Sequence, residues 1–267
     1  MRFACAIEYL GTEFSGWQKQ VVKNTVQEIC ENAFSKIADH EVTLVCAGRT
    51  DRGVHATCQV VHFDTKSLRK DDAWVRGSNG YLPSSIKVKW VKEVDDTFHA
   101  RFSALSRSYR YIIWNDFTCS ALLQGLTSWC YTPIDIAEMQ NASKYLLGTH
   151  DFSSFRSAGC QAKTPIRTIE SISIHRNNAC VVFDITANGF LQNMVRIIIG
   201  CLLEVGTGRK SIHWVETVLQ SKDRKVNSKT MTPNGLYLTY VKYHDRYQLP
   251  LTMPIVPTIS LANEVTN

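Results

Sequence analysis

Apolar and polar positions alternate with a period of two at the start of the chain, as is typical of half-buried β-strands. The odd positions from Phe3 to Tyr9 are apolar or aromatic. The segment Thr25–Glu28 then has the form of a capping box and predicts a helix that runs to about Ala38. The further elements predicted in this half are strands over 42–46 and 58–63, a helix over 71–81, and strands over 86–93 and 107–114. Strands and helices therefore follow one another in a βαββαβ-like order.

The second half of the chain follows a similar scheme. It predicts a helix over 138–147 that ends at Gly148, strands over 167–175 and 180–186, a long apolar helix over 191–205, a helix over 211–220 and a strand over 236–243. No Gly/Ser linker separates the halves, so the boundary is placed only within 115–135. We expect an α+β protein with an N-terminal domain over 1–115, a C-terminal domain over 116–250 and an extended, proline-punctuated tail over 251–267.

The net charge of +6 and the isoelectric point near 8.8 favour an anionic partner. Basic residues gather with aromatic ones in the segments 66–76, 101–110, 156–167 and 222–229. This arrangement suits a surface that follows phosphates and offers rings for base stacking. Four unrelated solvated edges are an equally good interpretation of the composition alone.

The nine cysteines are scattered singly from Cys5 to Cys201, with no C-x-x-C pair and no metal-ligand spacing. They are typical of small buried side chains in a reducing compartment. The N-terminus lacks the apolar core of a signal peptide, and the longest apolar run, Ile197–Leu203, is too short to cross a bilayer. We therefore expect a cytoplasmic protein that binds neither a metal nor a membrane.

The most informative stretch is the loop expected between the second and third strands. It runs Ala-Gly-Arg-Thr-Asp-Arg-Gly-Val-His-Ala over residues 47–56 and places Asp51 between Arg49 and Arg52, with two glycines that allow a tight turn. Residue types alone slightly favour an ordinary solvated connection, because charged turns are common and functional carboxylates are few.

The whole decapeptide resembles the active-site motif G-R-T-D-x-G-V-H-A of the TruA family of tRNA pseudouridine synthases. Further motifs follow in family order and extend the resemblance over roughly residues 2–250. They are ARFSA at 100–104, RSYRY at 107–111, HDFSSFR at 150–156, CQAKTPIR at 160–167, NGFLQNMVR at 188–196 and DRY at 245–247. Together these matches make the resemblance specific.

The resemblance implies the isomerisation of uridine to pseudouridine at positions 38, 39 and 40 of the tRNA anticodon arm. In this reaction the N1 glycosidic bond breaks, the uracil turns and C5 reattaches to the ribose, so no cofactor, metal or external energy is required. The family also implies two ferredoxin-like, RNA-recognition-like βαββαβ halves that form a continuous antiparallel sheet with a central active-site cleft. It implies a homodimer that binds tRNA with both subunits.

By resemblance, Asp51 is the catalytic carboxylate, and Tyr109 is the active-site tyrosine that stacks on the uracil. Arg49 matches the arginine linked to turning the target nucleotide out of its stack. Arg196 matches the partner of the catalytic carboxylate, and an arginine among the apolar residues of a helix needs an anion unless its stem reaches water. The remaining residues assigned to substrate binding are Arg107, His150, Asp151 and Arg156.

Other chemistry-bearing residues keep simpler interpretations beside these roles. His55 and His150 titrate near neutrality and are secondary acid–base candidates, although a structural histidine is the commoner outcome at His55. Asp151 is either a loop-ordering or an RNA-contacting acid. The segment Gly206–Ser211 echoes a phosphate-binding loop but lacks its spacing. A non-catalytic protein that binds structured RNA through the same sheet and basic edges is the alternative function.

Overall fold

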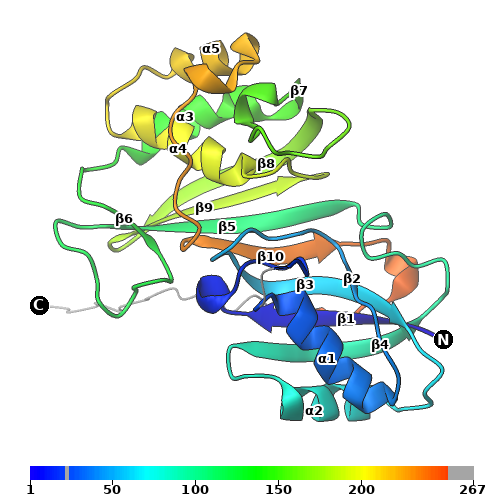
Figure 1. The fold of residues 1–267 in the computed structure, drawn as a ribbon. Helices are drawn as coiled ribbons and strands as arrows, with labels where there is room; N and C mark the ends of the chain where they lie inside the picture. Colours follow the sequence, from blue (N-terminus) through cyan, green and yellow to red (C-terminus); the bar gives the residue numbers. More distant parts are fainter. Residues whose placement is uncertain (22–23, 252–267) are drawn as a thin grey trace, which may run out of the picture. The chain divides into compact units, whose positions relative to one another are not determined.

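The computed structural model describes residues 1–21 and 24–251. The helices are α1 (Val26–Ala38), α2 (Asp71–Tyr81), α3 (Ile136–Ser143), α4 (Met194–Gly206) and α5 (His213–Ser221). The strands are β1 (Arg2–Tyr9), β2 (Val45–Cys46), β3 (His55–Asp64), β4 (Ile86–Val94), β5 (Ser106–Asn115), β6 (Ser128–Cys130), β7 (Gly148–Asp151), β8 (Ile166–Asn177), β9 (Cys180–Ala187) and β10 (Leu236–Lys242). The predicted α+β class is confirmed (Figure 1).

The described residues form a mixed, mostly antiparallel ten-stranded sheet, whereas the family resemblance implied an antiparallel one. The order is β4-β1-β3-β10-β5-β9-β8-β7, with β2 paired to β3 and β6 to β5. Tyr237 of β10 lies opposite His55 in a parallel pair, and Ser128 of β6 lies opposite Ile113 in another. Parallel neighbours require a connection that crosses back over the sheet, which residues 116–127 provide between β5 and β6, while β3 and β10 are far apart in the sequence. The short strands β6 and β7 were not predicted.

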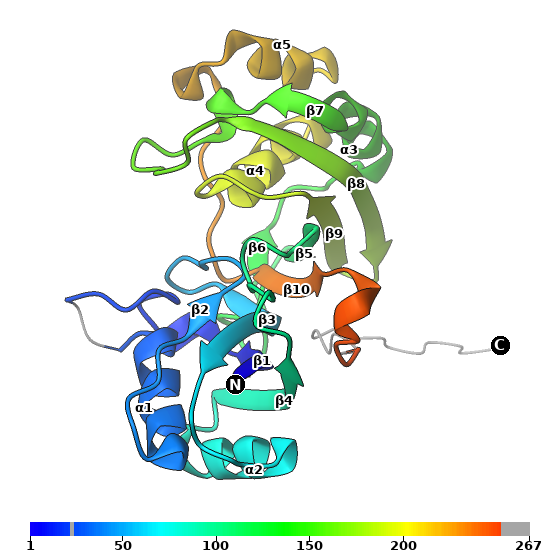
Figure 2. The same ribbon diagram turned by 90° about the vertical axis from the view of Figure 1, so that its right-hand side faces the viewer.

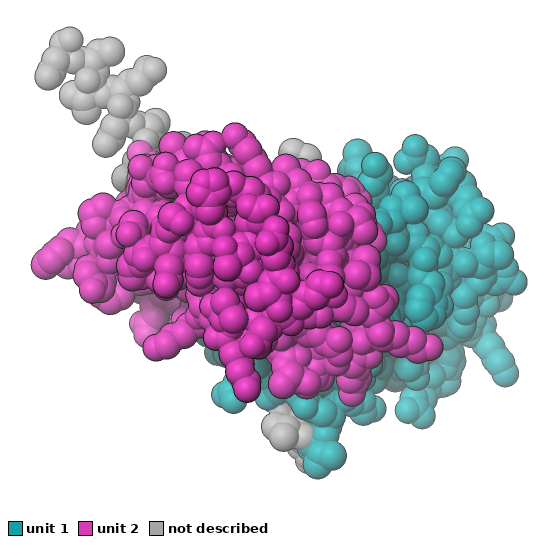
Figure 3. All heavy atoms as spheres, turned by 90° about the horizontal axis from the view of Figure 1, so that it is seen from above, with its two compact units in different colours: residues 1–109, 237–255 teal, residues 110–236, 256–267 magenta. Residues whose placement is uncertain are grey.

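The chain divides into two compact units, which are coloured separately in Figure 3. Unit 1 consists of Met1–Tyr109 and the segment that begins at Tyr237, and unit 2 consists of Arg110–Leu236. Unit 1 is discontinuous because β10 pairs with β3. The domain limits placed at 115 and 250 stay predictions, and the predicted tail lies outside the described residues from residue 252 onward.

Unit 1 has the element order β1-α1-β2-β3-α2-β4, and its two helices lie on the same face of its strands (Figures 1 and 2). Aromatic rings join the layers. Phe3 of β1 stacks on Phe63 of β3 with ring centroids 5.5 Å apart, and Phe63 contacts Phe34 of α1 at 5.0 Å and Trp74 of α2 at 5.1 Å. Each fully buried aromatic side chain contributes roughly 2 to 3 kcal/mol of hydrophobic stabilisation, so these rings fix the helices on the sheet that carries the loop at 47–54.

In unit 2 the apolar helix α4 is buried on almost every side, as its composition predicts. It begins at Met194 rather than at Leu191, because Asn193 adopts a left-handed conformation with φ 61°. Helix α3 packs beside α4 where Gly206 leaves room for the side chain of Met139. No helix within the described residues is long and apolar enough to cross a membrane.

Candidate active site

The loop that carries Asp51 connects β2 to β3 within unit 1 and turns sharply after the aspartate. The Val54 amide donates a hydrogen bond of 3.1 Å to the Asp51 carbonyl oxygen. Gly53 has φ 78°, a left-handed conformation that other residues adopt only with strain. The turn leaves the Asp51 side chain half-buried and the side chains of Arg49 and Arg52 exposed.

The backbone on either side of Arg49 is fixed by buried groups from other parts of unit 1. The Trp17 amide donates to the Thr50 carbonyl oxygen at 3.0 Å, and the hydroxyls of Tyr9 and Thr50 are hydrogen-bonded at 2.7 Å. The side-chain amide of Gln59 donates to the Gly48 carbonyl oxygen at 2.6 Å. A surface loop is mobile by default, but this one is held at residues 48 and 50.

The segment between β1 and α1 approaches the loop so closely that only glycine fits. Gly16 has φ 92°, and a Cβ atom there would lie 2.9 Å from the Thr50 carbonyl oxygen and 3.1 Å from the carbonyl carbon of Asp51. Gly11 lies against the backbone of Val54, and its amide donates to Nδ1 of His55 at 3.0 Å. His55 is fully buried, so it has the structural role that the sequence favoured.

The phenol of Tyr109 is the second functional group at this loop. Tyr109 lies on β5 with only 8% of its surface exposed, and its hydroxyl is 4.0 Å from the point where a Cβ of Gly48 would lie. Burial, and then the negative charge of Asp51, raises the pKa of Tyr109 above its usual value of 10.0. The phenol is therefore a neutral hydrogen-bond donor near physiological pH. Unit 1 thus brings Tyr109 to the Asp51 loop.

Arg107 contributes from the same strand, two residues before Tyr109. Its guanidinium donates to the carbonyl oxygens of Ala47 at 3.0 Å, Arg101 at 2.6 Å and Ala104 at 3.2 Å. Burial lowers the pKa of Arg107, while nearby tyrosine hydroxyls act in the opposite direction. The side chain therefore links the start of the Asp51 loop to the loop that precedes β5.

The other predicted site residues belong to unit 2. Arg196 lies in the first turn of α4, where Nε donates to the Met231 carbonyl oxygen at 2.6 Å and Nη1 donates to the Asn193 side chain at 2.7 Å. Because Arg196 and Asp51 belong to different units, their pairing stays a prediction.

The motif at 150–156 is ordered by local hydrogen bonds. Asp151 accepts from the Ser153 amide at 2.9 Å and from its hydroxyl at 2.7 Å. Burial alone would raise the pKa of Asp151, but these bonds and the charge of Lys222 lower it below its usual value. Nε2 of His150 is hydrogen-bonded to the Leu147 carbonyl oxygen, and Arg156 donates to the Cys160 carbonyl oxygen. Asp151 therefore orders its own loop, while the substrate-binding roles of these residues stay predictions.

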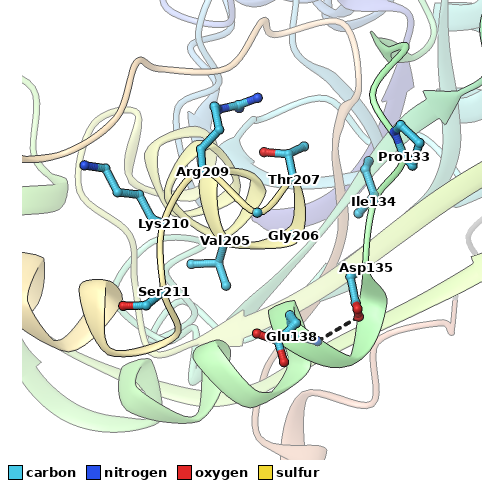
Figure 4. A pocket seen from close by; sticks show the side chains of 11 residues that line it. Pro133, Ile134, Asp135, Glu138, Val205, Gly206, Thr207, Arg209, Lys210 and Ser211 are labelled. Atoms are coloured by element: carbon cyan, nitrogen blue, oxygen red, sulfur yellow. Dashed lines mark hydrogen bonds between the residues drawn. The ribbon is translucent and has the colours of Figure 1, made fainter.

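An open pocket of about 800 Å³ lies elsewhere in unit 2, between the start of α3 and the end of α4 (Figure 4). It is lined by the Gly206–Ser211 segment, with Asp135 and Glu138 on the opposite side. The Asp135 carboxylate accepts from the Glu138 amide at 3.0 Å, and the Asp135 amide donates to the Gly206 carbonyl oxygen at 2.8 Å. These polar groups cap two helix ends, and no predicted site residue lines this pocket within the described part of the chain.

Three residues that brace the loop were not predicted from the sequence: Tyr9, Gly16 and Gln59. The local pattern around each of them indicates a strand or a connection but no contact with the loop. These contacts join residues that are far apart in the sequence, so a local pattern cannot reveal them. A glycine next to a tryptophan at positions 16 and 17 is a local sign that the backbone can approach another segment closely. Among residues 1–21 and 24–251, no group of three or more His, Cys, Asp or Glu side chains could hold a metal ion.

Comparison with known proteins gives consistent matches over almost the whole chain. A family model described as tRNA pseudouridine synthase matches residues 5–103 and 142–244. The chain is 48% identical over 256 residues to the tRNA pseudouridine synthase A of Coxiella burnetii, covering 96% of this chain and 98% of the relative. It is 50% identical over 250 residues to the proteins of the same name from Shewanella halifaxensis and Colwellia psychrerythraea, covering 94% of this chain and 96% of each relative.

Proposed function

The chain belongs to the TruA family of tRNA pseudouridine synthases, and from this premise we propose that it isomerises uridines 38, 39 and 40 of the tRNA anticodon arm, with Asp51 as the catalytic carboxylate. The enzyme is thus an isomerase that modifies tRNA. The geometry of the Asp51 loop is the observation that supports this site. It presents a half-buried carboxylate from a backbone held on both sides, beside a buried phenol.

The isomerisation sets simple demands on such a site. The bond between C1′ and N1 breaks, a bond between C1′ and C5 forms, the C5 hydrogen leaves as a proton and N1 takes up a proton, so the reaction is neutral in redox terms. A carboxylate beside the ribose and uracil supplies either the nucleophile or the base that starts it, and exclusion of water keeps the detached uracil in place. Asp51 is the carboxylate that the loop presents for this step.

Tyr109 and Arg49 have distinct parts in this proposal. Because the Tyr109 phenol stays protonated, it packs against the uracil and donates a hydrogen bond rather than acting as a phenolate base. Arg49 is exposed beside Asp51, where its side chain can enter the space that an extruded nucleotide leaves in the RNA. Arg196, His150, Asp151 and Arg156 complete the proposed site, with Arg196 as the partner of Asp51.

We also propose the architecture and assembly that the family resemblance implies. Unit 1 has the order βαββαβ and the strand sequence β4-β1-β3-β2, which supports a ferredoxin-like N-terminal half, and we propose a second such half in the remainder of the chain. The net charge of +6 supports tRNA binding by an extended basic surface. We further propose a cytoplasmic homodimer in which both subunits contact the tRNA.

Release of tritium from unmodified tRNA labelled at uracil C5 tests this function directly, because forming pseudouridine expels the C5 hydrogen. We expect release by the wild-type enzyme, none by Asp51→Asn, and normal release by the matched control Asp72→Asn, an exposed aspartate on α2. Asp51→Asn should still bind tRNA. Binding without release by the wild type would instead support a non-catalytic RNA-binding protein, and equal release by Asp51→Asn would remove Asp51 from the mechanism.

A further inference from the structure

Arg107 joins two loops that are separate in the sequence. One is the Asp51 loop, whose first residue, Ala47, gives its carbonyl oxygen to Nη2 at 3.0 Å. The other is the turn before β5, where Arg101 and Ala104 give their carbonyl oxygens to Nη2 and Nη1 at 2.6 and 3.2 Å. A guanidinium is planar and presents several N–H groups in a fixed fork, so one arginine can hold backbone segments in a defined relation.

The turn before β5 is itself well ordered, so it gives Arg107 a firm anchor. The Ser103 amide donates to the His99 carbonyl oxygen at 2.8 Å, and the amides of Arg101 and Phe102 each lie 3.2 Å from Nδ1 of His99. The hydroxyl of Tyr243 on the C-terminal segment of unit 1 donates to the Ala100 carbonyl oxygen at 2.6 Å. A link from this turn to Ala47 therefore limits movement at the start of the Asp51 loop.

Ala47 is held at both its amide and its carbonyl group. Its amide donates to the Val60 carbonyl oxygen at 2.8 Å, so its amide is fixed by the sheet and its carbonyl by Arg107. The next carbonyl, that of Gly48, is held by Gln59. Arg107 also leads directly to Tyr109 along β5, since residues two apart on a strand point to the same face.

We propose that Arg107 is a positioning residue that holds the Asp51 loop and Tyr109 in register for the reaction, rather than a residue that binds a tRNA phosphate. This inference rests on the proposed function, because it assigns Arg107 to the same site. It differs from the substrate-binding role that the sequence predicts for Arg107, and the two roles have different consequences. A lost phosphate contact weakens RNA binding and its dependence on salt, whereas a lost positioning contact slows the reaction of bound tRNA.

Arg107→Met and Arg107→Lys test the proposal, with Lys89→Met as the control for the loss of one positive charge at an exposed site of unit 1 that lies outside the four basic segments. We expect Arg107→Met to lower the single-turnover rate of tritium release about 100-fold at saturating tRNA. The dissociation constant for tRNA and its slope against salt concentration should stay unchanged. Arg107→Lys, which keeps the charge but not the fork, should give an intermediate rate, and Lys89→Met should match the wild type.

Hydrogen–deuterium exchange supplies a readout that does not depend on activity. Peptides that cover residues 47–54 should exchange about tenfold faster in Arg107→Met, while the peptides of α2 and β4 keep the wild-type rate. A salt slope reduced by about one, with a normal rate at saturation, would overturn the proposal in favour of a phosphate contact. So would unchanged exchange in the loop. Faster loop exchange in a protein whose wild type releases no tritium would refute the proposed function and leave the positioning contact standing.

Discussion

Replacing Gly16 by alanine should separate catalysis from stability in this enzyme. Gly16 is exceptional because its backbone has φ 92° and because a Cβ atom would lie 2.9 Å from the Thr50 carbonyl oxygen. The conformation alone costs an ordinary residue about 1 to 2 kcal/mol. The steric contact would also displace the loop, since the atoms that must move belong to Thr50, Asp51 and Arg52.

The size of that movement follows from the distances. An ordinary contact begins at about 3.4 Å, so the loop must retreat by roughly 0.5 Å from a Cβ placed 2.9 Å away. Catalytic groups need to be held within about 0.5 Å of their productive positions, and a displacement of about 1 Å can cost 100-fold in rate. We therefore expect Gly16→Ala to lower kcat by about 10- to 100-fold.

Gly208→Ala is the control that removes the ambiguity between strain and displacement. Gly208 lies just past the end of α4 with φ 74°, but no atom lies within 4 Å of the point that a Cβ would occupy, so alanine there brings the strain without pressing on another segment. Both variants should lose a few degrees in Tm, roughly 2 to 4 °C for each kcal/mol. Tritium release should slow only in Gly16→Ala. If Gly16→Ala keeps kcat within twofold of Gly208→Ala at equal Tm, the approach of Gly16 does not set the position of Asp51.

Two further predictions concern ionisation. Burial, reinforced by the charge of His99, lowers the pKa of His62 from 6.5 to about 4, so the stability that neutral His62 contributes is present above pH 6.5 and is lost as the pH falls through 4. The free energy of unfolding, measured by urea denaturation, should therefore fall by roughly 3 kcal/mol by pH 4 in the wild type and by less in His62→Asn. Equal losses in both proteins would contradict this. Burial and the charge of Asp51 raise the pKa of Tyr109 above 10.0, so the pH profiles of kcat/KM for the wild type and Tyr109→Phe should run parallel from pH 7 to 10. A decrease in kcat/KM at alkaline pH that occurs only in the wild type would refute a protonated phenol.

The sequence predicts the centre of the proposed site from residues that are contiguous in the chain. Asp51 and both glycines of the turn lie within ten residues, and the period-two patterns on either side predict the strands that present them. The helices were predicted for the same reason, since their apolar periodicity and the cap at Thr25 are local features. Strands β6 and β7 are too short, at 3 and 4 residues, to show a period.

What the sequence could not reveal depends on pairing between distant segments. Tyr9 alternates in β1 like any core aromatic, yet its hydroxyl meets Thr50 because the register of β1 and β3 places Tyr9 opposite Ala56 at the end of the loop. Gln59 interrupts an apolar strand without a local reason, and its bond to the Gly48 carbonyl oxygen shows what a polar side chain does at this position. The motif around Arg107 indicates a family role, but its carbonyl partners emerge only when the two loops meet.

The braces of the Asp51 loop act in different ways, and this determines how precise the site is. Hydrogen bonds hold the loop at the side chains of Tyr9, Gln59 and Arg107. Each bond contributes only about 1 kcal/mol of stability, or somewhat more for the charged group. Gly16 instead limits the loop by contact, and a limit of this kind does not weaken when one bond breaks. These hydrogen bonds and the close approach of Gly16 together confine the backbone more narrowly than either does alone. The position of Asp51 is consequently a property of β1, β3, β5 and the segment before α1 together, not of the ten residues that identify it.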